Sequence, residues 1–491
     1  MSHEDLEKTF GGLEPRPLWH HFSHFTRIAR PSGHEQAMAN YVIAWAKERG
    51  LTVDSDATGN LCVRVPASPG RENAPAVVLQ GHLDMVCEKD ADSPYDSEKG
   101  TIHAEREGDW IVARGTTLGA DNGIGVAAAM AIAEDNSLRH GPLDLLMTID
   151  EETGMTGASG LDPELLRGRI MINLDSEDDG VLFVGCAGGA DVKHIFRAVR
   201  QEPLEGTMAL EVVVGGLKGG HSGLEINRGR MNAIRALARL LQAASQEIEI
   251  SIASIQGGNK RNAIPRESRA LVFIPGDDEA LFREAIEKER QALAYQYRGL
   301  DDGLTVTITA PAEEPAEVFE VQDSMRLLAL IRATPTGVIA MSQDIAGLVE
   351  TSTNLGVVST DGDEVTVWNL ARSSNAPALQ DVLDTLHMIG WLTGVEIQDL
   401  GGYPGWKPDM NSRILQVTRT VFEREYTRAP EVTAIHAGLE CGLIGDRVPN
   451  MDMVSFGPDI RGVHAPGEKV NVPSVGRFYR LLGAVLDAVS A

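Results

Sequence analysis

The sequence predicts an α/β fold in which a domain built on a mostly parallel sheet is interrupted by an α+β domain. Three observations lead to this prediction. Apolar strands alternate with helices over residues 35–178, the order of elements changes between 208 and 394, and helix and strand patterns return after 409. At 491 residues the chain is long enough for more than one domain. We therefore expect one domain at 1–205 and 400–491, with an inserted domain at 206–399.

The first segment alternates between helical and strand patterns. EQAMANYVIAWAKERG at 35–50 is typical of an amphipathic helix, DNGIGVAAAMAIAED at 121–135 of an alanine-rich helix, and NLCVRV at 60–65 of a short strand. Three longer strands are apolar: APAVVLQGHLDMV at 74–86, LDLLMTIDEE at 143–152 and RIMINLDSED at 169–178. Apolar strands between helices indicate a parallel sheet covered on both faces. Such sheets carry their sites at the carboxyl ends of the strands.

The inserted segment has a different order of elements. A strand at 208–220, a helix at 231–246, strands at 248–256 and 268–275, a helix at 278–296 and a strand at 304–311 give the order β-α-β-β-α-β, which is ferredoxin-like. A looser copy follows, with a helix at 324–334, a hairpin at 354–371 and a helix at 376–394. GGYPGWKPD at 401–409 is rich in turn residues and marks the return to the first domain.

The composition argues against several classes of partner. The formal net charge of −27 disfavours nucleic acids and anionic membranes, which require a basic face. Four widely spaced cysteines fit a reducing compartment, and the polar start MSHEDLEKTF lacks the order of a signal peptide. No apolar stretch is long enough for a transmembrane helix. We therefore expect a cytoplasmic protein.

Histidines and carboxylates follow the apolar strands at the points where those strands end. Taken one at a time, Asp121 is most simply a helix N-cap and Asp175 a solvated turn residue. Taken together, they form a set of imidazole and carboxylate groups without cysteine, which suits Zn²⁺, Mn²⁺ or Co²⁺. Because parallel strands end at the same edge of a sheet, we expect the set to converge. Its members are His82, Asp84, Asp121, Glu151, Glu152, Asp175 and, from a later Gly/Pro loop, His464.

Spacing within this set indicates different tasks. His82 and Asp84 are two residues apart in an extended segment, so Asp84 can accept the second ring N–H of a metal-bound His82. Glu151 and Glu152 are adjacent, so their side chains diverge. One of them can bind a metal ion while the other acts as a base toward the hydrolytic water.

The ordered motifs GHLDMV, LGADNGIG, DEETGMTGA, NLDSE, GGHSG, NKRNAIPRE, YPGW, HAGLECG and SFGPDIRGVHAPGE extend over almost the whole chain. They resemble those of the co-catalytic di-zinc peptidases, and in detail those of the cytosolic non-specific dipeptidases, also called aminoacyl-histidine or Xaa-His dipeptidases. The resemblance implies that His82, Asp121 and Asp175 hold one metal ion, and that Asp121, Glu152 and His464 hold the other. It also implies Glu151 as general base, Asp84 as the orienting acid and a cis peptide between Asp121 and Asn122.

The same resemblance implies that the inserted domain is a lid and dimerisation domain, and that the protein is a homodimer. His221 in GGLKGGHSG would stabilise the oxyanion, and Asn262 and Arg372 would contact the substrate. Without the family these residues read as a turn histidine, a turn asparagine and a surface arginine. His436 and Glu440 in IHAGLECG are expected at the rim of the site, with Glu440 meeting the free amine of the substrate.

We therefore predict a metallo-dipeptidase that hydrolyses unblocked dipeptides, Xaa-His among them, and uses two divalent ions, with Zn²⁺ expected first and Mn²⁺ or Co²⁺ as alternatives. An N-acyl amino acid deacylase or carboxypeptidase on the same scaffold is the near alternative. A non-catalytic peptide-binding protein is a further alternative, which the complete ligand set and Glu151 disfavour. A metal-dependent phosphatase or nuclease is disfavoured by the net charge of −27.

Overall fold

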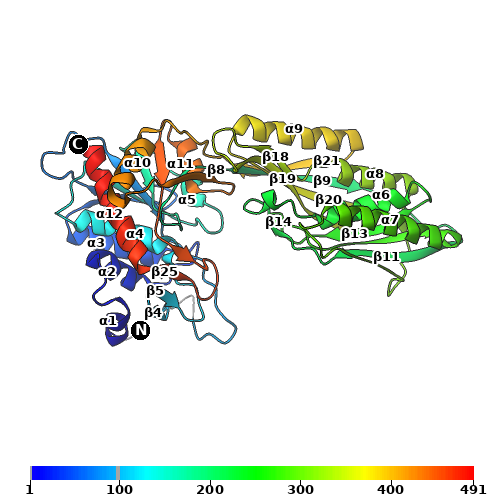
Figure 1. Ribbon diagram of the computed structural model, residues 1–491, viewed down its shortest axis with the longest axis horizontal. Coiled ribbons are helices and arrows are strands. Elements are labelled where there is room, and N and C mark those ends of the chain that lie inside the picture. Colours follow the sequence, from blue (N-terminus) through cyan, green and yellow to red (C-terminus); the bar gives the residue numbers. More distant parts are fainter. Residues whose placement is uncertain (1–2, 96–99) are drawn as a thin grey trace. The chain divides into compact units, whose positions relative to one another are not determined.

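The computed structural model describes residues 3–95 and 100–491, which form two compact units. The first unit contains the described chain up to Gly185 together with Pro408–Ala434 and Leu439–Ala491, and the second contains Cys186–Lys407 and Ile435–Gly438. In Figure 1 the colours follow this division, with blue-to-cyan and orange-to-red segments in the first unit and mostly green and yellow ones in the second. The chain therefore leaves the first unit after Gly185, returns at Pro408, and leaves it again only for the short segment Ile435–Gly438.

The first unit is built on an eight-stranded sheet with the order β1-β2-β6-β3-β7-β23-β8-β22. Its four central strands, β6, β3, β7 and β23, pair in parallel, while β1, β2 and β8 pair antiparallel. Strand β2 is antiparallel both to β1, which precedes it in the chain, and to β6. The strands are β1 (Thr52–Ser55), β2 (Leu61–Val65), β3 (Val77–His82), β6 (Leu143–Thr148), β7 (Ile170–Asn173), β8 (Val181–Cys186), β22 (Glu431–Ile435) and β23 (Asp452–Ser455).

Helices and a small four-stranded sheet complete the first unit. Strands β3 and β6 are buried at every position, as a sheet covered on both faces requires. The helices are α1 (His3–Phe10), α2 (Arg16–Phe25), α3 (Gln36–Glu48), α4 (Ala120–Glu134), α5 (Thr156–Ser159), α10 (Arg413–Tyr426), α11 (Glu440–Arg447) and α12 (Val472–Ser490), with a 3₁₀ turn at Pro163–Leu165. The small sheet has the order β24 (Ile460–Arg461), β25 (Lys469–Asn471), β5 (Trp110–Ala113), β4 (Ala104–Glu107).

Helix α4 shows how the sequence positions a functional segment. It is rich in alanine and buried from Asn122 to Ile132, so it packs closely against β3 on one side and α2 on the other. At its start, Asp121 and Asn122 have non-helical backbone angles and are joined by a cis peptide bond. This confirms the cis bond expected from the resemblance. Asp121 lies in the first turn of the helix, with its carboxylate 3.0 Å from His82 at the end of β3.

The second unit is built on a nine-stranded antiparallel sheet with the order β16-β11-β15-β13-β19-β20-β9-β21, with β18 paired to β19. Helices α6 (Ala233–Ala244), α7 (Glu279–Gln296), α8 (Val321–Ala333) and α9 (Ala376–Thr393) pack on it (Figure 1). The strands are β9 (Gly188–Arg197), β11 (Thr207–Gly215), β13 (Ser251–Gly257), β15 (Ser268–Pro275), β16 (Thr305–Thr309), β18 (Gly337–Met341), β19 (Val349–Asp361), β20 (Glu364–Ser373) and β21 (Glu396–Tyr403). Shorter elements are β10 (Arg200–Gln201), β12 (Gly220–His221), β14 (Ala263–Ile264), β17 (Val318–Phe319) and 3₁₀ turns at Ile226–Arg228 and Gly276–Asp278.

Two β-α-β-β-α-β arrangements share this sheet. The first runs β11-α6-β13-β15-α7-β16, as the sequence predicted, with the spatial order β16-β11-β15-β13. The second runs β9-α8-β19-β20-α9-β21, with the corresponding spatial order β21-β9-β20-β19. The two arrangements meet where β13 pairs with β19. The second copy looked incomplete in the sequence because its first strand, β9, precedes the whole of the first copy.

Strand β9 also explains where the units divide. It pairs along its length with β20 and over most of it with β21, so it belongs to the second sheet. The boundaries therefore fall after Gly185 and after Lys407, whereas the sequence placed them after residues 205 and 399. Within the described part of the chain, no helix has the length and apolar character needed to cross a bilayer.

Candidate metal centre

Parallel pairing in the first unit brings three of the predicted segments to one edge of the sheet. Strand β3 ends at His82, which is in register with Thr148 at the end of β6. Strand β7 ends at Asn173, two residues before Asp175, and Asn173 is in register with Gln80. The strand order β6-β3-β7 therefore places the segments that carry Glu151 and Glu152, His82, and Asp175 next to one another.

Three groups of three residues gather at this edge, and Asp121 belongs to the first two, while the third consists of His82, Glu151 and Glu152. In the first, Nε2 of His82 lies 3.0 Å from Oδ1 of Asp121 and 3.3 Å from Oδ1 of Asp175. In the second, Nε2 of His464 lies 3.3 Å from Oδ2 of Asp121 and 2.8 Å from Oε2 of Glu152. The potential ligand atoms within each group all lie within 4.8 Å of one another. The two groups that contain Asp121 therefore adjoin at its carboxylate, and each offers a set of ligand atoms suited to a cation.

The charges in these groups call for a cation. Burial raises the pKa of Asp175 well above its ordinary value, and the charge of Asp121 raises it further. Hydrogen bonds to Asp121 and Glu152 raise the pKa of His464 to about 11. Oε1 of Glu152 and Oδ1 of Asp175 are buried and accept no hydrogen bond in the described structure. Without a bound ion, protons on His464 and Asp175 balance the crowded carboxylates, and a cation would take the place of those protons. An N/O donor set of this kind fits Zn²⁺, Mn²⁺ or Co²⁺.

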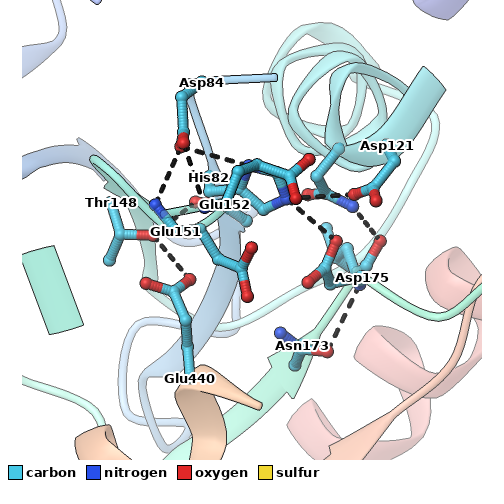
Figure 2. A network of polar contacts seen from close by, with 12 residues as sticks. His82, Asp84, Asp121, Thr148, Glu151, Glu152, Asn173, Asp175 and Glu440 are labelled. Atoms are coloured by element: carbon cyan, nitrogen blue, oxygen red, sulfur yellow. Dashed lines mark hydrogen bonds and ion pairs between the residues drawn. The ribbon is translucent and has the colours of Figure 1, made fainter. Parts of the chain in front are cut away.

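Asp84 is fully buried and orients its neighbours. Its Oδ1 lies 3.3 Å from Nδ1 of His82, on the opposite side of the ring from Asp121. Its carboxylate also accepts the backbone N–H groups of Glu151 and Glu152, each at 3.1 Å. Burial opposes ionisation, but the hydrogen bonds, chiefly that from His82, hold the pKa of Asp84 well below its usual range. Asp84 therefore fixes both the His82 ring and the turn that carries the two glutamates (Figure 2).

The side chains of the three consecutive acids at 150–152 point in different directions. Asp150 has a left-handed backbone with φ of 55°, and its carboxylate accepts hydrogen bonds from Thr153 and, at 2.7 Å, from Thr156. Glu152 turns to His464, while the Glu151 side chain points into the space that faces Asp175 and Glu440 (Figure 2). Burial raises the pKa of Glu151 well above its ordinary value, with Asp175 and Glu440 adding to the effect. Cations at the neighbouring ligand atoms would lower it again.

Glu440 lies deeper than the sequence suggested. It is 1% exposed at the start of α11, and its Oε2 accepts hydrogen bonds from Gln80 at 2.6 Å and Thr148 at 2.7 Å. Burial raises its pKa to about 7. Its other oxygen, Oε1, is buried and accepts no hydrogen bond among the described residues. In the first unit Glu440 is thus a buried member of the polar network and not a rim residue (Figure 2).

Four predicted substrate residues belong to the second unit. Nδ1 of His221 accepts N–H groups from Gly223 and Leu224 at 3.1 and 3.0 Å, so the other ring nitrogen carries the proton. Burial, and then Arg372, lower the pKa of His221. Nη1 of Arg372 donates to the Tyr403 hydroxyl at 2.7 Å.

Nε2 of His436 contacts Ser352 Oγ at 2.7 Å, and burial followed by Arg372 and His221 lowers its pKa to about 4. The structure therefore groups His221, Arg372 and His436. Asn262 is exposed, and its backbone carbonyl accepts from Ser222.

Several residues that support the centre were not predicted from the sequence. Glu468 is 2% exposed and accepts the N–H groups of Leu118 and Ala120 at 2.7 and 2.8 Å, just before Asp121. Gln80 and Asn173 join the strands beneath the ligands, with Asn173 Nδ2 donating to Gln80 Oε1 at 2.5 Å. In the sequence they are marked only by their positions: Glu468 ends SFGPDIRGVHAPGE, Asn173 begins NLDSE, and Gln80 directly precedes GHLDMV.

Comparison with known proteins gives a consistent result. The family model described as peptidase family M20/M25/M40 matches residues 78–488. The chain is 40% identical over 479 residues to the cytosol non-specific dipeptidase of Escherichia coli (strain K12), covering 98% of this chain and 99% of the relative. The solved structure of aminoacylhistidine dipeptidase from Vibrio alginolyticus matches with a TM-score of 0.92 at 40% identity, over 99% of each chain. Human carnosine dipeptidase 1, 13% identical with a TM-score of 0.51 over 99% of this chain and 98% of its own, shares the fold.

Proposed function

This chain belongs to peptidase family M20/M25/M40, and from that membership we propose that it is a metal-dependent dipeptidase acting on unblocked dipeptides, Xaa-His dipeptides among them. The observation that carries the proposal is the pair of three-residue groups that share Asp121, with Glu151 beside them. The dipeptidase names of two relatives, each 40% identical over nearly the whole chain, support the substrate class.

We propose two divalent ions per chain, with Zn²⁺ expected first and Mn²⁺ or Co²⁺ as alternatives. His82, Asp121 and Asp175 would hold one ion, and Asp121, Glu152 and His464 the other. When bound, such ions polarise a peptide carbonyl and lower the pKa of a water molecule. The N/O character of the ligands and the buried Oε1 of Glu152, which accepts no hydrogen bond among the described residues, support this assignment.

Glu151 is the proposed general base. Its carboxylate takes a proton from the hydrolytic water as the water oxygen bonds to the peptide carbon. The same proton then passes to the leaving nitrogen as the C–N bond breaks, so the products are a carboxylic acid and a free amine, which ionise to a carboxylate and an ammonium group. Asp84 keeps the base in place, because it accepts the backbone N–H of Glu151 and holds the His82 ring.

Substrate recognition is proposed for five further residues. The N–H of the neutral His221 suits an oxyanion, and the Arg372 guanidinium suits the C-terminal carboxylate of a dipeptide. His436 and Asn262 would contribute further polar contacts. Glu440 is proposed to accept the free amine of the substrate through Oε1, which requires this buried oxygen to become accessible. Such a contact would separate dipeptides from N-acyl amino acids.

We also propose that the second unit is a lid and dimerisation domain and that the enzyme is a cytoplasmic homodimer. Exposed apolar side chains on α9 support a covered surface: Met388 is 55% exposed and Trp391 and Leu392 are each 72% exposed. Light scattering tests this part, with a dimer expected for the wild type. A monomeric wild-type protein would contradict it.

A paired assay tests the catalytic proposal. Dipeptides, including Xaa-His, are compared with their N-acetylated forms on protein loaded in turn with Zn²⁺, Mn²⁺ or Co²⁺. Hydrolysis of the free dipeptides alone is the expected result. Preferential hydrolysis of the acetylated compounds would instead support a deacylase, and binding without turnover would support a peptide-binding protein.

A further inference from the structure

The segment Arg30–Glu35, with the sequence RPSGHE, lies between α2 and α3 and has no role in the proposed chemistry. It runs beside the loop that follows β3. The backbone carbonyl of Arg30 accepts the N–H of Met85 at 3.0 Å, and Pro31 forms a parallel bridge with Met85. Three of its side chains reach the loops that carry Asp84, Asp121 and the two glutamates.

Arg30 joins two of these loops. Its side chain is buried, with the residue 1% exposed, and Nη1 donates to the carbonyls of Leu83 and Asp84 at 3.0 and 2.7 Å. Nη2 donates to the carbonyl of Gly119 at 2.5 Å, two residues before Asp121. The guanidinium thus ties the loop after β3 to the loop before α4. A buried cation that binds backbone carbonyls, and forms no ion pair with a carboxylate of the described residues, is well suited to fixing backbone positions.

Two glycines of the LGADNGIG motif make room for this guanidinium. A Cβ atom on Gly119 would lie 2.5 Å from Nη2 of Arg30, and one on Gly123 would lie 2.8 Å from the same atom. Gly119 also has φ of 68°, which disfavours any side chain there. The spacing of glycines in this motif therefore serves Arg30 as well as the turn.

Ser32 and Glu35 reach the remaining loops. Ser32 Oγ donates to Oδ2 of Asp84 at 2.7 Å. Oε1 of Glu35, which is 6% exposed, accepts the N–H of Asp150 at 3.0 Å and that of Gly33 at 2.8 Å. Glu35 therefore holds the first residue of the acidic turn, while Asp84 holds the next two.

We propose that Arg30, Ser32 and Glu35 are positioning residues that set the spacing of the three loops for cation binding. This rests on the proposed metal centre. The carboxylates of Asp121, Glu152 and Asp175 repel one another when no cation is present, so unbraced loops would move apart. A brace built from the segment 30–35 keeps the ligands preorganised, and outer contacts of this kind change metal affinity by about 10–100-fold when removed.

Four variants and one control test the brace. They are Arg30→Met, Ser32→Ala, Glu35→Ala and Glu35→Gln, with Arg64→Met as control. Arg64 pairs with Asp54 and Asp144 in the same unit, and Asp144 lies near the start of β6, away from the ligand end. Affinity for Zn²⁺ and Mn²⁺ is measured on metal-stripped protein by competition with a chromophoric chelator, and kcat and KM are measured on reloaded protein.

We expect metal affinity about 10-fold weaker in Ser32→Ala and Glu35→Ala, and weaker still in Arg30→Met, with kcat lowered more than KM raised. Glu35→Gln should keep most of the wild-type metal affinity, because an amide oxygen can accept the same N–H groups. The Arg64→Met control should bind metal as the wild type does. If Arg30→Met does not fold, the Ser32 and Glu35 variants decide.

Two results would overturn the brace. One is unchanged metal affinity in Ser32→Ala and Glu35→Ala, and the other is equal damage from Glu35→Gln and Glu35→Ala, which would indicate a role of charge rather than position. A wild-type protein that binds no divalent metal would refute the proposed function itself, since the brace is tested only by comparison with a metal-binding wild type.

Discussion

Glu468 offers a direct test of how the segment before Asp121 is held. Its carboxylate accepts the N–H groups of Leu118, Gly119 and Ala120 at 2.7, 3.1 and 2.8 Å, and more weakly that of the partly buried Asp121 at 3.4 Å. Leu118 and Ala120 are 1% and 0% exposed, so water reaches these donors poorly once the carboxylate is removed. The substitution Glu468→Ala therefore leaves three buried backbone donors without an acceptor.

The expected cost follows from that count. A buried donor left unsatisfied costs about 1–3 kcal/mol, so Glu468→Ala should lower the free energy of unfolding by about 3–9 kcal/mol. Glu468→Gln keeps the size and one acceptor oxygen but turns an amide NH₂ toward the other N–H groups. It should therefore cost roughly half as much. Burial raises the pKa of Glu468 to about 6, so the comparison belongs at pH 8, where the carboxylate is ionised.

Urea unfolding of metal-free protein, followed by circular dichroism, measures the cost. Hydrogen exchange of the peptide that covers 116–121 locates it, because those amides should lose protection. Glu72→Ala is the matched control: Oε1 of Glu72 accepts the N–H of Gly70 at 3.0 Å in an exposed turn, and its loss should leave unfolding unchanged. The account of this segment is wrong if Glu468→Ala lowers the free energy of unfolding by less than about 1 kcal/mol and leaves these amides protected from exchange.

Three further predictions concern chemistry and pH. Glu151→Gln should lower kcat by about 10²–10⁴-fold with the metal content unchanged, and near-normal turnover would remove Glu151 from the role of base. Chelation should abolish activity, and Zn²⁺, Mn²⁺ or Co²⁺ should restore it; full activity in a metal-free preparation would refute the metal requirement. Burial alone would raise the pKa of Glu134, but hydrogen bonds from His21 and Trp45 lower it to about 2. The ionised carboxylate should therefore stabilise the folded protein above pH 4.5, and this contribution should disappear as the pH falls toward 2. The test measures the free energy of unfolding of Glu134→Gln and of the wild type as the pH is lowered. The same pH dependence in both proteins would contradict the prediction.

The parts of the fold that could be predicted are those encoded by local patterns. Apolar runs such as 143–148 become buried parallel strands, and the helix-strand order between 208 and 311 reproduces the first ferredoxin-like arrangement. The second arrangement could not be completed from the sequence, because β9 lies about 150 residues before the hairpin that it joins. Pairing across that distance depends on tertiary packing and leaves no local signal.

The candidate ligands were predictable for a related reason. Each lies at the end of an apolar strand, before a helix or in a Gly/Pro loop, and parallel pairing makes strand ends converge. The supporting residues were not, because Arg30, Glu35 and Glu468 act by binding backbone groups of distant loops. An arginine that binds carbonyls looks in sequence like any surface arginine. Only the folded backbone shows that its partners are the segments carrying the site.

The acidic turn shows how supporting contacts make adjacent like charges useful. Glu35 accepts the N–H of Asp150, and Asp84 accepts those of Glu151 and Glu152, so the backbone of all three acids is fixed from two sides. With the backbone fixed, the side chains cannot relax away from one another by moving the turn. Their repulsion can be relieved only by protonation or by bound cations. A site constrained in this way should bind divalent ions more tightly than the same residues on a mobile loop, because the cost of bringing the carboxylates together is met during folding.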